Sequence, residues 1–64
     1  MEKSLIQEIL NKLASGELNE YTVNKEDFLE FRTELVKRQD FKHFRGIAQH
    51  GGKVTYQYME KPRS

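Results

Sequence analysis

The chain has 64 residues, enough for one small domain over residues 1–64, and no cysteine, which excludes disulfides, thiolate metal sites and thiol nucleophiles. It has 11 Lys or Arg and 10 Asp or Glu, giving a formal net charge of +1, so the overall charge favours no particular partner. Apolar residues follow one another in pairs at most, far short of the roughly 20 that a membrane span needs, which predicts no membrane contact and a cytoplasmic location.

The first helix is predicted to begin at Ser4. Ser4 and Gln7 have the spacing of a capping box, in which their side chains satisfy backbone amides at the helix start. Apolar residues then recur at the helical period, and Gly16 supplies the left-handed conformation at which helices commonly end. Glu8 and Lys12 form an i,i+4 pair on the opposite face. The predicted apolar stripe comprises Leu5, Ile6, Ile9, Leu10 and Leu13.

A short strand is predicted over residues 20–23, which are rich in β-branched and aromatic side chains, and a second helix from residue 25 to residue 38 or 39. Asn24 is suited to cap that helix, because its side-chain oxygen can accept a hydrogen bond from the first turn. The helix carboxylates are expected on its outer face, with Arg38 four residues after Glu34 as a partner. The predicted buried stripe comprises Phe28, Phe31, Leu35 and Val36.

A β-hairpin is predicted next, because two short apolar segments flank Gly51 and Gly52, and each glycine can take a positive φ without a steric penalty. A two-residue loop at these glycines places Ile47 opposite Tyr56. The face predicted to pack on the helices comprises Ile47, Val54, Tyr56 and Tyr58.

The predicted architecture is α+β: two amphipathic helices packed on a C-terminal antiparallel β-hairpin, with room for a third strand near residues 20–23. Residues 40–44 can extend the second helix or begin the hairpin, and residues 60–64 are expected to form a frayed tail. The element order resembles the winged-helix class, in which the hairpin is the wing. That class places two helices between its first strand and the wing, whereas one continuous helix fits here, so the resemblance assigns no family.

Charge is distributed unevenly along the chain. Residues 1–35 carry 4 basic and 8 acidic side chains, and residues 36–64 carry 7 and 2, which gives net charges of −4 and +5. The basic residues of the second segment alternate with Phe41, His43 and Phe44, a composition typical of phosphate-contacting surfaces and also of ordinary solvated faces. The residues predicted to contact nucleic acid are Arg38, Lys42, Arg45 and Lys53.

No catalytic residue, metal site or cofactor is predicted. Residues 46–54 depart from a phosphate-binding loop, because an additional glycine precedes Lys53 and a strand follows. His43 and His50 have neither cysteine neighbours nor the spacing of a metal-binding helix. A chain of this size seldom forms the pocket that catalysis needs.

The sequence therefore predicts a small non-enzymatic binding module whose partner is nucleic acid or an acidic protein. The alternative is a protein-interaction module or a homodimer with no nucleic-acid role, using the unpaired edge of the hairpin or its tyrosines. The tyrosines available for such an interface are Tyr21, Tyr56 and Tyr58.

Overall fold

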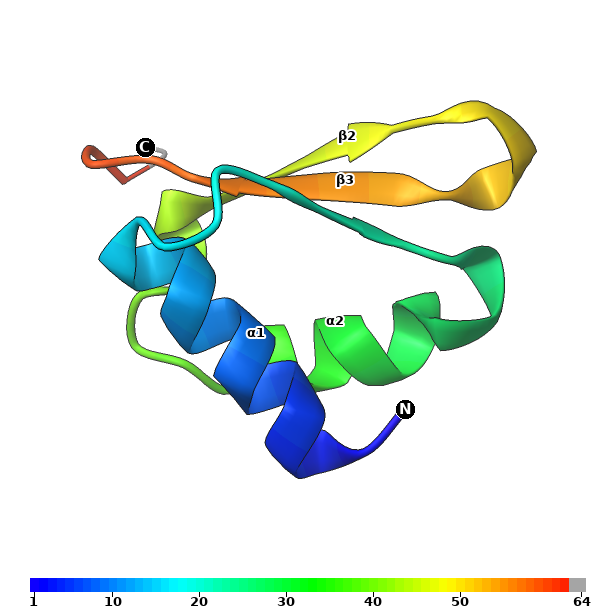
Figure 1. Cartoon of the computed structure of the whole chain (residues 1–64), viewed down its shortest axis with the longest axis horizontal. Helices are drawn as coiled ribbons and strands as arrows, with labels where there is room; N and C mark the ends of the chain where they lie inside the picture. The colour runs from blue at the N-terminus through cyan, green and yellow to red at the C-terminus, as the bar shows by residue number, and fades with distance from the viewer. Residues whose placement is uncertain (63–64) are drawn as a thin grey trace.

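Two helices lie on one side of a three-stranded antiparallel sheet in the computed structural model, which describes residues 1–62 (Figure 1). The predicted α+β architecture is confirmed, including the third strand. No helix among the described residues is long and apolar enough to cross a membrane. The elements are α1 (Lys3–Ser15), β1 (Tyr21–Val23), α2 (Phe28–Val36), β2 (Phe44–Ala48) and β3 (Val54–Tyr58), with short 3-10 turns at Lys25–Asp27, Phe41–His43 and His50–Gly52.

The first helix starts earlier than the sequence predicted. Glu2 occupies the position before α1, and Ser4 lies inside the first turn without capping it, so the predicted capping box is wrong. Gly16 ends the helix as predicted, with φ of 87° and its amide donating to the Leu13 carbonyl. Leu5 is 44% exposed, whereas the rest of the predicted stripe is buried. The buried residues of α1 are Ile6, Ile9, Leu10 and Leu13.

The second helix is shorter than predicted. A 3-10 turn over Lys25–Asp27 precedes α2, and Asn24 stands before that turn without a side-chain cap, which corrects the predicted capping role. After Val36 the α-helical hydrogen-bond pattern gives way to a 3-10 pattern. The Arg38 amide donates to the carbonyl of Leu35, three residues earlier, instead of to the carbonyl four residues earlier. Residues 40–44 do not extend the helix; they form a 3-10 turn and the start of β2.

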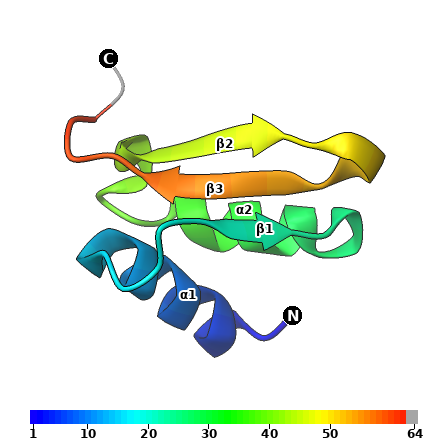
Figure 2. The same cartoon turned by 45° about the horizontal axis from the view of Figure 1, so that its top comes forward.

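β3 is the central strand, between β1 and β2 (Figure 2). The hairpin register differs by one residue from the predicted register, since Ile47 lies opposite Thr55 and Gly46 lies opposite Tyr56. A slip of one residue exchanges the two faces of a strand. Phe44 therefore faces the helices, with 1% of its surface exposed, and Ile47 faces the opposite side of the sheet.

The hairpin loop explains the slip. The Gln49 amide donates to the Lys53 carbonyl at 2.8 Å, so three residues, rather than two, separate the last bonded pair. Gly51 and Gly52 have φ of 76° and 79°, values that favour glycine at both positions. The glycines thus make the turn as predicted, but the turn includes His50.

Aromatic rings link the helices to the sheet. The Phe31 ring is fully buried and stacks on Tyr56 at 5.0 Å between ring centroids and on Tyr21 at 6.1 Å. On the other side of the sheet the Thr22 and Thr55 hydroxyls lie 2.9 Å apart in a hydrogen bond. The predicted tail over residues 60–64 lies partly outside the described residues, and residues 59–62 contain no helix or strand.

Candidate functional site

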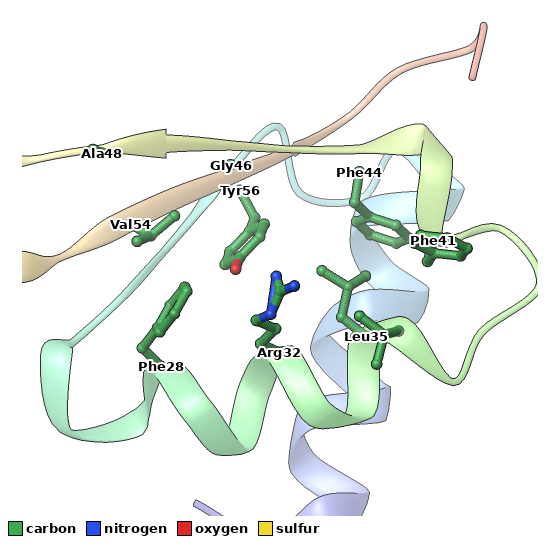
Figure 3. Close-up of a pocket in the computed structure, with 10 residues that line it drawn as sticks. Phe28, Arg32, Leu35, Phe41, Phe44, Gly46, Ala48, Val54 and Tyr56 are labelled. Carbon is green, nitrogen blue, oxygen red and sulfur yellow. The ribbon is translucent and has the colours of Figure 1, made fainter. Parts of the chain in front are cut away.

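A groove of about 440 Å³ opens between α2 and β2 (Figure 3). Phe28, Arg32 and Leu35 project from α2 toward the sheet, and the backbone of Gly46 and Ala48 passes above them. Val54 and Tyr56 form the back of the groove, and Phe41 and Phe44 close one end. The side chains around the groove are therefore mostly apolar, with one cation among them, although polar atoms supply nearly half of its exposed surface.

The observed register creates this groove. It turns Phe44, Gly46 and Ala48 toward the helix layer, and two of these three residues are too small to reach α2. A Cβ at position 46 would lie 3.2 Å from the Tyr56 ring and from a Val54 methyl group. Glycine here lets the Tyr56 ring lie against the strand, while the space in front of it stays open.

Arg32 is the polar centre of the groove. It is exposed, and it lies four residues after Phe28 and three before Leu35, so all three share one face of α2. Among residues 1–62 no carboxylate forms an ion pair with its guanidinium. Burial raises the pKa of the Tyr56 hydroxyl and the Arg32 charge opposes that rise, so the groove offers a neutral phenol beside a cation.

The carboxylates of the second helix lie away from the groove, beside α1. Glu30 and Asp27 contact the Met1 amino group at 3.1 Å and 3.7 Å. Glu34 is buried rather than on the outer face as predicted, and it pairs with Lys37 at 3.1 Å instead of with Arg38. The hydrogen bond from Lys37 lowers the pKa of the Glu34 carboxyl.

Arg38, the first of the four residues predicted to contact nucleic acid, is occupied within the chain. Its Nε and Nη2 donate to Asp40 at 2.8 Å and 3.2 Å, and its Nη1 donates to Gln7 and Asn11 at 2.9 Å each. The guanidinium also lies 5.6 Å from the centre of the Phe44 ring, and 17% of the side chain is exposed. Arg38 joins α1 to the turn after α2, which removes it from the free basic residues.

Lys42, Arg45 and Lys53 are exposed. Arg45 lies opposite Gln57, and the alternation of side chains puts Arg45 and Lys53 on the sheet face that the helices do not cover. The Gln57 side chain donates to Glu20 at 3.4 Å on that face, so one acidic residue accompanies the two basic ones. The structure thus brings Arg45 and Lys53 onto one face and separates Arg38 from them.

The histidines show no metal-binding arrangement. His43 stacks on Tyr58 with 5.1 Å between ring centroids, and its Nδ1 lies 2.8 Å from the Met59 carbonyl oxygen. His50 is in the hairpin turn. Over residues 1–62 no three His, Asp or Glu side chains gather closely enough to hold a metal ion.

Arg32 was not predicted as a site residue, and Tyr56 was predicted only as one of three tyrosines available for an interface. Arg32 carried a signal that was available from the sequence, because a charged residue interrupts the apolar stripe of the second helix between Phe28 and Leu35. Nothing in the sequence indicated that Tyr56 faces a groove, since a tyrosine facing the core and a tyrosine facing a groove have the same place in the strand pattern.

Residues 3–57 match the family described as YkzS-like protein, and the chain belongs to that family. The matched region includes both helices and every residue that lines the groove. No curated protein and no solved structure matches the chain.

Proposed function

We propose that this member of the YkzS-like family is a non-enzymatic binding module that holds an extended segment of another protein in the groove between α2 and β2. The observation that carries the proposal is a groove lined mostly by apolar side chains, directly beside an unpaired strand edge. Such edges bind peptides by adding a strand: backbone hydrogen bonds supply affinity, and pockets for alternate side chains supply specificity.

The free edge beside the groove belongs to β2, and β1 forms the other edge of the sheet. The Met59 amide donates to the His43 carbonyl and the Gln49 amide to the Lys53 carbonyl, so the odd-numbered residues of this arm are in hydrogen-bonded pairs with β3. Hydrogen-bonded and non-hydrogen-bonded pairs alternate along an antiparallel ladder. The amides and carbonyls of Phe44, Gly46 and Ala48 therefore point to the open side, above the groove.

Selection from a random peptide library tests this function. The Ala48→Phe variant fills the groove with a ring, and the Gln49→Phe variant, one residue further along, adds the same ring on the other side of the strand. Both native residues are exposed, so both variants are expected to fold. We expect selected peptides to bind the native chain and the Gln49→Phe variant but not the Ala48→Phe variant. Failure to enrich binders, or equal binding to both variants, would refute a groove-binding function.

A second candidate function, nucleic-acid binding, is favoured by the common face of Arg45 and Lys53. Basic side chains on one surface gain affinity by releasing counterions from phosphates, and the effect weakens as salt is added. Amide resonances near these two residues and Lys42 should shift when DNA is added at about 50 mM salt. Shifts that persist in an Arg45→Gln, Lys53→Gln double variant, or no shifts at all, would count against this function.

A further inference from the structure

We infer that the groove selects an acidic peptide strand, in which an Asp or Glu flanked two residues away on each side by apolar residues binds Arg32. This inference rests on the proposed function and names the class of segment bound. Its basis is the spacing of side chains along α2 and β2, together with the charge around the groove.

Helix and strand run side by side along the groove, in opposite directions (Figure 3). Phe28 lies toward the Ala48 end, Arg32 lies near Gly46, and Leu35 lies near Phe44. From Phe28 to Arg32 the helix rises about 6 Å and from Arg32 to Leu35 about 4.5 Å, and two residues of strand rise about 6.6 Å, so the spacings agree to within about 2 Å. Successive inward side chains of a strand added to β2 would therefore meet Phe28, Arg32 and Leu35 in turn.

The two outer positions favour apolar side chains. At one end a side chain from the added strand would contact Phe28 and Val54, and at the other it would contact Leu35 and the Phe41 ring. Burying one aliphatic side chain in such surroundings is favourable by about 1.5–3 kcal/mol. The pattern apolar, any, acidic, any, apolar reads the same in both directions, so it applies to parallel and antiparallel addition alike.

The central position favours a carboxylate. The Arg32 guanidinium has no carboxylate partner among residues 1–62. A guanidinium binds a carboxylate through two parallel hydrogen bonds, and partial removal of water by the groove strengthens them. The Tyr56 hydroxyl, which points into the same space, can donate a further hydrogen bond (Figure 3).

The distribution of charge around the groove also favours an acidic ligand. The carboxylates Asp27, Glu30 and Glu34 lie on the α1 side of α2, where amino groups of the chain contact them. Arg45 and Lys42, on or next to β2, are exposed. An acidic segment approaching the free edge of β2 therefore meets positive charge, and a basic one is repelled.

Three synthetic nine-residue peptides test the inference: Val-Thr-Glu-Thr-Val with lysine and threonine flanks, and the same peptide with Gln or Lys in place of Glu. Each is titrated into the full chain while its amide resonances are recorded. We expect the Glu peptide to shift the Gly46 and Ala48 amides and the Arg32 side chain. Its affinity should exceed that of the Gln peptide roughly ten- to hundredfold, the range for a charge-assisted pair.

A charge exchange gives the decisive control. Arg32→Glu should reverse the order, so that the Lys peptide binds best, whereas Lys53→Glu on the uncovered face should leave the order unchanged. Equal affinities for the three peptides, no shift at the groove, or an order that Arg32→Glu does not reverse would overturn the acidic preference. The library selection decides the proposed function separately, because its peptides are not restricted in charge. A single-stranded oligonucleotide that shifts the groove amides more than the Glu peptide would also overturn the inference, in favour of a nucleic-acid ligand.

Discussion

Replacing Arg38 by methionine should destabilise the fold, because this side chain joins three parts of the chain. It donates two hydrogen bonds to Asp40 and one each to Gln7 and Asn11, and it lies over the Phe44 ring. Methionine keeps most of the aliphatic volume and the contact with the ring. The substitution therefore isolates the loss of the guanidinium.

The expected cost is about 2–3 kcal/mol. Hydrogen bonds to a charged group contribute roughly 1.5–3 kcal/mol, and the bonds to Gln7 and Asn11 add little, because those amides regain water at the surface. A chain of this length has a stability of roughly 3–10 kcal/mol in total, so the variant should lose a large share of it. The midpoint of thermal unfolding should fall by about 10–20 °C.

Thermal and urea unfolding followed by circular dichroism measure the loss. The matched control is Arg45→Met, since Arg45 is exposed and its replacement should change stability by less than about 0.5 kcal/mol. A double-mutant cycle with Asp40→Asn should give a coupling of at least about 1 kcal/mol, because the two side chains are in direct contact. An Arg38→Met variant as stable as Arg45→Met would refute the structural role of Arg38. Arg38 would then again be a candidate for contacting a partner.

Three other measurements follow from the structure. Phe31→Ala should cost about 3–5 kcal/mol and unfold most of the chain, whereas Leu29→Ala, at a position 74% exposed, should leave the melting curve nearly unchanged. The hydrogen bonds from Arg38 lower the pKa of the Asp40 carboxyl below its usual 3.8. The stability that this pair contributes is therefore complete above pH 3.8 and is lost as the pH falls through the lowered pKa of the folded state. An acid titration of stability without such a loss would contradict the ion pair. Gly46→Ala should cost about 1–2 kcal/mol, because its Cβ would lie 3.2 Å from the Tyr56 ring, and a neutral result in urea unfolding would show that the ring can move aside.

The local features of the chain could be predicted from the sequence alone. The stripe of α1, its end at Gly16, the short strand before the second helix and the glycine turn of the hairpin each depend on residues close together in sequence. The extent of α2 was overestimated, because the Arg38 and Asp40 pair and the buried Phe44 ring stabilise a turn where sequence periodicity alone would continue the helix.

The candidate site could be predicted only in part: the sequence identified exposed basic residues but not how the hairpin arranges them. Arg45 and Lys53 would lie on opposite faces with the predicted two-residue loop, and they share the uncovered face only because the observed loop has three residues. The groove was not predicted, since it depends on the faces of β2, and a single residue added to the loop exchanges them. With Ile47 facing inward, as predicted, its side chain would have stood where the groove lies open between Gly46 and Ala48.

Residue order alone determined the α+β class, the two amphipathic helices, the glycine turn and the excess of positive charge after residue 36. These are properties of short segments, in which propensity and periodicity act over a few neighbouring residues. Tertiary packing decided the strand register, the pairing of Arg38 with Asp40, Gln7 and Asn11, and the position of Arg32 in an open groove. Those outcomes depend on contacts between segments far apart in the chain, such as Arg38 with α1 and the inward face of β2 with α2, and these contacts exist only once the helices cover the sheet.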